Sequence, residues 1–264
     1  MNARIHIGVG GWTYEPWRNN FYPPALQQSR ELAFAGSKLT AIEVNGTYYG
    51  TQKRSSFAKW RDETPDGFVF TLKGSRYATN RKLLATAGES IERFVESGIA
   101  ELGAKLGPIV WQFATTKRFE ADDFEAFLAL LPAAAEGIAL RHAVEVRNAS
   151  FMCAEFLRVA RKYQVATVFT DSADYPSFGD TTAGFVYARL MRAEAGHASG
   201  YAGAALDAIA DCARAWSRGE EPAVLPRVEP DPPPAAPRDV YLYFIDGAKE
   251  RAPAAAMALI ERLR

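Results

Sequence analysis

Residues 143–147 read Ala-Val-Glu-Val-Arg, a short run in which apolar and charged side chains alternate. Successive side chains of a β-strand point to opposite faces, so Glu145 and Arg147 share one face while Val144 and Val146 share the other. The run is rich in β-branched residues and short, which predicts a strand. Its valine face is expected to lie against helices, and its charged face to point the other way.

Segments of this kind recur along the chain and are short enough to be strands. They are Ile5–Gly10, Ala41–Asn45, Phe68–Lys73, Ile109–Phe113, Ala143–Arg147, Val165–Asp171, Phe185–Leu190 and Val240–Ile245. Helical spacing of apolar residues appears between most of them, in Ser29–Gly36, Ser55–Asp62, Ala87–Gly103, Asp122–Leu131, Ala154–Tyr163, Ala202–Trp216 and Pro253–Leu263. Alternating strands and helices predict an α/β fold with a parallel sheet. At 264 residues, a single (β/α)8 TIM barrel over residues 1–264 is the expected fold.

Two stretches interrupt the pattern. Ser172–Gly184 has no helical spacing, so one crossover helix is expected to be missing or minimal. Residues 220–238 contain seven prolines, which exclude a helix and indicate an exposed connection before the last strand. The alternative, a doubly wound open sheet, normally carries a GxGxxG turn that leads into a helix. Gly8-Val-Gly10-Gly11 lacks this spacing and is followed by Trp12.

Polar residues lie at the carboxyl ends of several predicted strands and face the barrel interior by the same alternation. Active sites of TIM barrels are built at this end, because the loops after the strands converge there. Burying a single charge would cost several kcal/mol, so charges from separate strands at one place indicate a site or an ion-pair network that closes the core. The residues are Glu43, Asn45, Lys73, Gln112, Glu145, Arg147, Tyr187 and Arg189.

Charge, cysteine content and the length of apolar stretches indicate which partners and which cellular compartment to expect. The chain has 31 basic and 31 acidic residues, so no overall charge draws it to nucleic acid or to a membrane. Cys153 and Cys212 form no CxxC pair and are expected to be free thiols in a reducing compartment. No stretch has the length of a signal sequence or a membrane span, so we expect a cytoplasmic protein.

Ordered motifs along nearly the whole chain resemble those of the YecE-like family, which is catalogued as a domain of unknown function. They are Gly8–Trp17, Glu43–Tyr49, Phe70–Thr79, Leu106–Phe113, Glu145–Arg147, Tyr187–Leu190 and Tyr241–Phe244. The resemblance implies a TIM barrel. It also implies similarity in fold to metal-dependent endonuclease and sugar-isomerase barrels, from which a DNA-related role has been suggested. Fold analogy by itself does not establish function.

The chain departs from the family pattern at positions where histidine is expected. These positions hold Asn80, Asn148 and Met191, so chemistry that depends on those histidines is in doubt. The remaining histidines, His6, His142 and His197, stand away from predicted strand ends, which argues against a site with several metal ions.

No cofactor is required by the sequence. One Mg²⁺ on Glu43, Glu145 or Asp171 remains open.

Several chemical roles fit the predicted charges. Glu43 and Glu145 suit a general base or nucleophile, or they simply hold the cations in place. Lys73 suits either phosphate binding or an imine mechanism, and sequence does not give the sign of its pKa shift. Guanidinium groups bind phosphate or carboxylate through two parallel hydrogen bonds, and aromatic rings beside them can stack a base or sugar. The ligand-binding candidates in these loops are Trp12, Tyr14, Tyr48 and Arg76.

We therefore expect a charged pocket for a phosphate-bearing or otherwise anionic ligand. A pocket of this kind would also suit the hydrolysis of a phosphoester. Glu43, Glu145 and Lys73 are the candidate catalytic residues. One alternative is a non-catalytic nucleic-acid-binding protein, whose binding would depend strongly on salt. Another is a carbohydrate hydrolase that uses the two glutamates, which must then flank an open cleft. The oligomeric state stays open.

Overall fold

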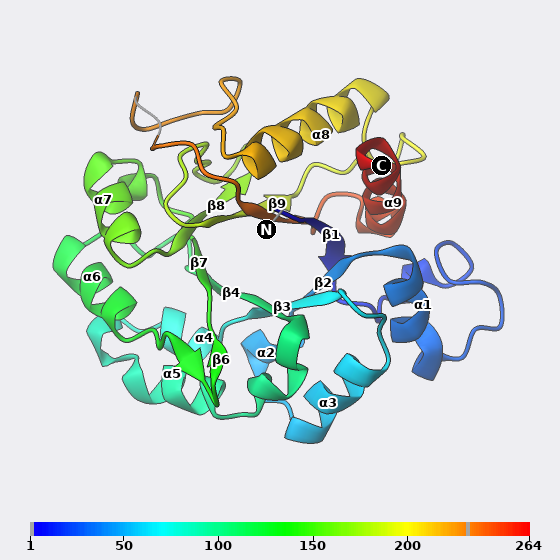
Figure 1. Cartoon of the computed structure of the whole chain (residues 1–264), viewed down its shortest axis with the longest axis horizontal. Coiled ribbons are helices and arrows are strands. Elements are labelled where there is room, and N and C mark those ends of the chain that lie inside the picture. Colours follow the sequence, from blue (N-terminus) through cyan, green and yellow to red (C-terminus); the bar gives the residue numbers. More distant parts are fainter. Residues whose placement is uncertain (1–2, 231–232) are drawn as a thin grey trace.

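In the computed structural model, which describes residues 3–230 and 233–264, eight parallel strands close into a barrel. Around the barrel they follow the order β1-β10-β9-β8-β7-β4-β3-β2 (Figure 1). Their bounds are β1 Ile5–Gly10, β2 Ala41–Val44, β3 Val69–Lys73, β4 Leu106–Gln112, β7 His142–Glu145, β8 Ala166–Thr170, β9 Phe185–Leu190 and β10 Asp239–Phe244. The predicted (β/α)8 TIM barrel is confirmed.

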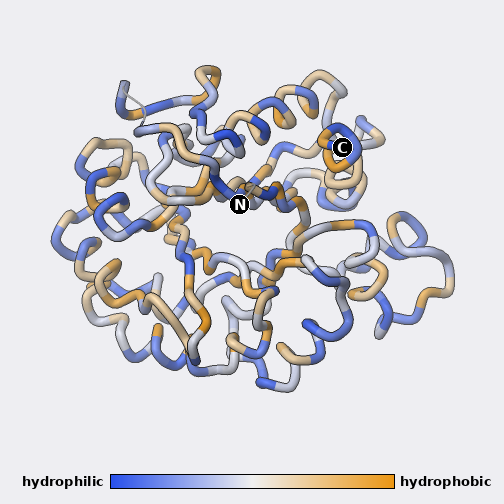
Figure 2. The backbone as a smooth tube through the Cα atoms, viewed as in Figure 1, coloured by the Kyte–Doolittle hydropathy of each residue, from blue (hydrophilic) through white to orange (hydrophobic). Residues whose placement is uncertain are grey.

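Helices surround the barrel (Figure 1). The longer ones are α1 Glu31–Lys38, α3 Arg54–Asp62, α5 Gly88–Val95, α6 Ala121–Ala129, α7 Ala154–Lys162, α8 Gly203–Arg218 and α9 Ala252–Leu263. Hydrophilic and hydrophobic residues alternate along them in Figure 2, as expected of helices that bury one face. Among the described residues no helix is both long and apolar enough to cross a membrane.

Local structure differs from the sequence-based expectation in three respects. Ala87–Gly103 does not form one helix, because Gly98 adopts a left-handed φ of 103° and separates α5 from a 3-10 turn at Ile99–Lys105. A small hairpin, β5 Ala134–Ala135 and β6 Ile138–Ala139, was not expected. Glu136 and Gly137 both have positive φ in its two-residue turn, the geometry that favours tight hairpins. The short helices α2 Gly46–Tyr49 and α4 Arg76–Thr79 were also missed.

The barrel separates two apolar cores, in agreement with the strand alternation. Residues on the outward faces, such as Ile42, Val44 and Leu72, belong to the large core beneath the helices. A smaller cluster fills the interior and includes Val69, Val110, Ala143, Val168, Phe185, Tyr187, Tyr241 and Tyr243. The inward residues that follow toward the carboxyl ends of the strands are charged or polar. The apolar interior thus ends in a charged layer, which we call the mouth layer: Glu43, Lys73, Gln112, Glu145 and Arg189.

The connection from β8 to β9 contains no helix, as predicted from Ser172–Gly184. The proline-rich stretch, the orange trace between α7 and α8 in Figure 1, lies against this connection. It is therefore anchored and is not simply an exposed connection. The buried carboxylate of Asp180 accepts hydrogen bonds from the backbone N–H groups of Val228 (2.9 Å) and Glu229 (3.0 Å). The backbone N–H of Thr181 donates to Glu221 (2.6 Å), and Arg238 is 5% exposed.

Candidate functional site

Strand register brings the mouth layer to one level of the barrel. Gln112 on β4 pairs with Glu145 on β7, and Arg189 on β9 pairs with Tyr243 on β10. Glu43 on β2 and Lys73 on β3 are also buried and occupy the last or next-to-last positions of their strands. Each of these side chains points inward because its neighbours along the strand pack outward against the helices.

Arg189 lies at the centre of this layer and is 2% exposed. Its Nη2 donates to Glu43 Oε1 (3.0 Å) and its Nε to Glu43 Oε2 (3.1 Å), a bidentate ion pair. Its Nη1 donates to Glu145 Oε2 and also to Gln112 Oε1 (3.2 Å). One guanidinium thus satisfies carboxylates from two different strands.

The other oxygen of Glu145 is held by a second arginine. Arg147 Nε donates to Glu145 Oε1 (2.5 Å), and Arg147 Nη2 donates to Gln112 Oε1 (3.1 Å). Burial alone would raise the pKa of Glu145, but Arg189 and Arg147 hold it below its ordinary value. The side chain of Arg147 remains 19% exposed, so it faces both the network and the solvent.

Beneath Glu43, neutral hydroxyl groups continue the network into the barrel. Tyr187 OH donates to Glu43 Oε2 (2.7 Å) and lies 3.0 Å from Thr71 Oγ1. Burial and the nearby Glu43 carboxylate raise the pKa of Tyr187 well above its ordinary value, so the phenol keeps its proton. Every oxygen of the two glutamates therefore has a donor within the protein.

Lys73 differs from the other charges of the mouth layer. It is 8% exposed, and within residues 3–230 and 233–264 no carboxylate lies within ion-pair distance of its ammonium group. The pKa of Lys73 is lowered to about 8, chiefly by burial and also by Arg189, while Glu43 and Glu145 oppose the shift. The ammonium lies 4.5 Å from the centre of the Tyr48 ring, a cation–π contact.

The rim of the barrel carries further cations and aromatic rings. Arg76 on α4 lies 5.7 Å from the ring of Tyr49 and 5.3 Å from that of Tyr77, both of which are exposed. Asn45 directly precedes α2 and is partly exposed. A cavity of about 400 Å³ adjoins this part of the rim, and its lining includes Thr47, Ser75, Arg81, Ser90 and Arg93. We call it the rim cavity.

Two residues near the mouth were missed from sequence. Tyr175, in the loop after β8, stacks on Arg147 with 4.2 Å between the guanidinium carbon and the ring centre. Lys249, after β10, lies 4.8 Å from the ring of Tyr14, and its pKa is lowered by burial although Asp246 and Glu43 oppose the shift. Both residues lie in loops that follow the carboxyl ends of strands, and this position could have identified them as candidates for the mouth of the barrel.

The structure does not bring Trp12, a candidate ligand-binding residue, into contact with the mouth layer, and its ring is partly buried against the outer core. Its ring packs edge-on against Trp60 on α3 (5.1 Å) and against Phe70 (6.5 Å), which belongs to the core beneath the helices. Tyr14 lies beside Lys249 but also packs edge-on against the buried Trp17 (5.5 Å). Aromatic residues after a strand end thus serve the outer core as readily as the mouth.

Asn148, Met191 and Asn80 stand where the family resemblance predicts histidine, and each has a different structural setting in this protein. Asn148 donates to Thr115 O (2.7 Å) and accepts from Ser150 N (3.0 Å). Met191 is buried, and its N–H donates to Asp171 Oδ1 (2.6 Å). Asn80 is exposed at the end of α4.

The structure does not bring the candidate Mg²⁺ ligands together. Glu43 and Glu145 bind Arg189, while Asp171 accepts hydrogen bonds from Met191 N and from Tyr201 OH (2.9 Å). In the described ranges no three or more His, Cys, Asp or Glu side chains gather as they would around a metal ion.

Comparisons with known proteins place this geometry in a family. A DUF72 family protein of Thermotoga maritima MSB8 has a solved structure with a TM-score of 0.75 at 21% identity, covering 98% of this chain and 99% of that chain. One from Enterococcus faecalis V583 has a TM-score of 0.70 at 18% identity, covering 99% of this chain and 98% of that chain. These likenesses show the fold.

The UPF0759 protein YunF of Bacillus subtilis (strain 168) is 25% identical over 114 residues, which make up 41% of this chain and 39% of that protein. The match therefore spans well under half of YunF. The family described as "Protein of unknown function DUF72" matches residues 6–264. A match over nearly the whole sequence decides the family, and the chain belongs to DUF72.

Proposed function

We propose that the mouth of the barrel binds a small molecule carrying a phosphate or another anionic group, with Lys73 as the cation that receives it. The supporting observation is a charge imbalance. The mouth layer together with Arg147 has two carboxylates, Glu43 and Glu145, and three cations, Lys73, Arg147 and Arg189, so −2 and +3 leave +1. Arg189 and Arg147 are engaged by the carboxylates, which leaves the charge on Lys73.

Desolvating an ammonium group without a partner is costly, and proteins retain such groups mainly at functional sites. An anion beside Lys73 would restore neutrality and raise the pKa of the lysine toward its ordinary value. Arg147, partly exposed and stacked on Tyr175, stands at the edge of the same layer and supplies a second set of donors. The rim cavity adjoins Tyr49 and Tyr77, and its lining includes Arg81 and Arg93 together with Glu89, but no side chain of the mouth layer.

The two glutamates have a positioning role in this proposal. Each is buried and each accepts hydrogen bonds on both oxygens, so neither is free to attack a substrate. The guanidinium of Arg189 touches both carboxylates, where a two-carboxylate glycoside hydrolase would need a cleft for sugar and water. This geometry disfavours the carbohydrate-hydrolase alternative. For hydrolysis of a phosphoester by water we assign to Lys73 the donation of a proton to the leaving-group oxygen, because a bound anion keeps the ammonium group protonated.

Titration calorimetry with inorganic phosphate and with adenosine 5′-monophosphate tests the binding. Both ligands should bind the unchanged protein, and Lys73→Met should weaken binding by about tenfold or more. Lys38→Met, on the exposed side of α1, is the matched control and should bind as the unchanged protein does.

The nucleic-acid alternative predicts a different result. Single-stranded DNA would then bind with an affinity that falls steeply with salt. Equal phosphate binding by the Lys73→Met and Lys38→Met proteins would refute the proposal for the mouth. Separately, p-nitrophenyl phosphate that is bound but not cleaved would remove the hydrolytic step and leave the binding site standing.

A further inference from the structure

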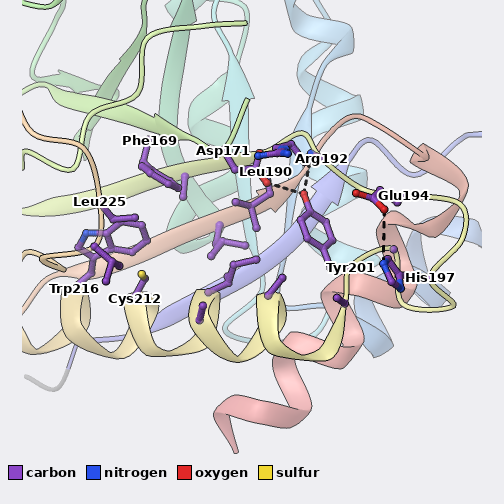
Figure 3. A pocket seen from close by; sticks show the side chains of 18 residues that line it. Phe169, Asp171, Leu190, Arg192, Glu194, His197, Tyr201, Cys212, Trp216 and Leu225 are labelled. Carbon is purple, nitrogen blue, oxygen red and sulfur yellow. Dashed lines mark hydrogen bonds and ion pairs between the residues drawn. The ribbon is translucent and has the colours of Figure 1, made fainter. Parts of the chain in front are cut away.

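A second cavity lies outside the barrel wall, between α8 and the strands β8, β9 and β10, with a volume of about 420 Å³ (Figure 3). We call it the outer cavity. The strands contribute the apolar side chains of Phe169, Ala188 and Leu190, and α8 contributes Ala205, Ile209 and Trp216. In Figure 3 the labelled side chains of Phe169, Leu190 and Trp216 lie between the strands and the yellow helix. No residue of the cavity lining belongs to the mouth layer.

The topology explains why space is left here. In a regular (β/α)8 barrel a helix follows each strand and covers the outer face of the sheet. Residues 171–184, between β8 and β9, form no helix, so the outer faces of these strands lack that cover. The stretch after α8 supplies Leu225 to the cavity lining, while the neighbouring Val224 is 82% exposed. The small side chains of Ala188 and Ala205 leave the remaining volume open.

The polar groups at one end of the outer cavity already satisfy one another. Tyr201 OH donates to Asp171 Oδ2 (2.9 Å) and accepts from the backbone N–H of Arg192 (2.9 Å), as the dashed lines in Figure 3 show. His197 Nε2 lies 3.7 Å from Glu194 Oε2. Arg192 and Glu194 at this same end carry opposite charges and are exposed, so neither is a buried cation or anion that would select a charged headgroup.

We propose that the outer cavity binds an uncharged, mainly apolar small molecule, of the class of medium-chain alcohols and similar lipophilic compounds. Its volume falls within the range of ligand pockets, and its walls are apolar with a few polar groups at one end, which is typical of such sites. An apolar occupant gains dispersion contacts that the empty walls lack, and burying a charged one would cost desolvation energy.

Displacement of a fluorescent probe tests the class of ligand. N-phenyl-1-naphthylamine, which is uncharged, should bind with increased fluorescence, and 1-decanol should displace it. Decanoate and decyltrimethylammonium should each be weaker than 1-decanol by about tenfold or more, because their charges must be desolvated. Better displacement by either ion, or no probe binding at all, would overturn the proposal. Probe binding that falls as the protein concentration rises would also overturn it, because a second copy would then occupy the cavity.

Two variants of α8 locate the probe. Ala205→Phe fills the outer cavity and should weaken probe binding by about tenfold. Ala204→Phe makes the same change one residue earlier, at an exposed position outside the cavity lining, and should leave binding unchanged. Equal effects of the two variants would contradict the assignment. Lys73→Met should not alter probe binding, so this proposal and the one for the mouth fail independently.

A thiol supplies a readout that does not depend on a variant that fills the cavity. Cys212 lines the outer cavity and is 8% exposed (Figure 3). In a Cys153→Ser protein it is the remaining cysteine of the chain, and serine is a favourable residue at that helix cap. Saturating 1-decanol should slow the reaction of Cys212 with a maleimide several-fold, whereas an unchanged rate would count against occupancy of the cavity.

Discussion

The guanidinium of Arg189 contacts the carboxylates of both Glu43 and Glu145, so three strands meet at one buried charge. Burial alone would lower the pKa of Arg189, but the two glutamates raise it above its ordinary value. The guanidinium fork is suited to this position because it donates in two directions within one plane. The burial of both glutamates therefore depends on Arg189.

Arg189→Met should destabilise the protein by about 3–5 kcal/mol, because it leaves two buried carboxylates with one cation fewer. Urea unfolding followed by circular dichroism measures the change. Arg214→Met removes an arginine whose side chain is 44% exposed on α8 and should change the free energy of unfolding by less than about 0.5 kcal/mol. Similar losses in both variants would show that the central ion pairs contribute little.

Lys73→Met should have the opposite effect on stability. The substitution removes a buried ammonium group that has no carboxylate partner in the part of the chain that the structure describes. We therefore expect a gain of about 1 kcal/mol in the free energy of unfolding together with loss of anion binding. Urea unfolding and phosphate titration of the same preparation check both effects. A less stable variant would instead assign Lys73 a structural role.

Sulfate binding should weaken as the pH rises through about 8, where Lys73 loses its proton in the free protein. Sulfate keeps its charge over this range, so the change reports on the protein. Calorimetric titrations between about pH 7 and about pH 9.5 should show the decline, and the Lys73→Met protein should lack it. A pH-independent affinity in the unchanged protein would mean that Lys73 does not contact the anion.

The same shift in the pKa of Lys73 affects folding with a definite sign. The folded state binds the proton less tightly than the unfolded state, whose lysine has its ordinary pKa of 10.5. The free energy of unfolding should therefore gain a contribution as the pH rises from about 8 to 10.5 and the cost of the buried charge disappears.

Acid should destabilise the protein through His142. Burial lowers its pKa to about 4, and its ring accepts from Trp111 Nε1 (3.1 Å) and lies 2.8 Å from Pro132 O. Because the unfolded state binds the proton more tightly, stability should fall as the pH drops from 6.5 through about 4. Melting curves should show a smaller pH effect for His142→Gln than for His197→Gln, whose histidine side chain is 44% exposed. An equal pH effect would place the acid sensitivity elsewhere, for example at His6.

Asp180→Ala should release the proline-rich stretch from the barrel. Its carboxylate accepts from two backbone N–H groups, at Val228 and Glu229, and the change leaves both without that partner. Trypsin should then cleave after Arg227 faster than in the unchanged protein, whereas the exposed Asp174→Ala should have no effect. Unchanged cleavage would show that other contacts hold this stretch.

Local alternation was enough to predict most of the mouth layer. Glu43, Lys73, Glu145 and Arg189 were assigned to the interior because side chains of a strand alternate, and strand geometry is set by neighbouring residues. The carboxyl ends of parallel strands meet at one end of a closed barrel, so the side chains were also expected to lie near one another. Both arguments need only the order of elements along the chain.

Partners and pKa shifts depended on contacts between distant parts of the sequence. Glu43 and Arg189 are 146 residues apart, and no local pattern indicates that Arg189 takes both glutamates while Lys73 takes neither. The sign of the Lys73 shift follows from that pairing and from burial. The contact of Trp12 with Trp60 on α3 likewise depends on how the outer core packs.

The sequence by itself determined the barrel, the direction of its strand residues and the missing helix after β8. Only the tertiary structure decided which charge of the mouth stays without a partner, and that an apolar cavity lies where cover is lacking between β8–β9 and α8. The physical reason is the distance along the chain over which each effect acts. Periodicity depends on neighbouring residues in the sequence, whereas desolvation and ion pairing depend on every group that folding brings within a few ångströms.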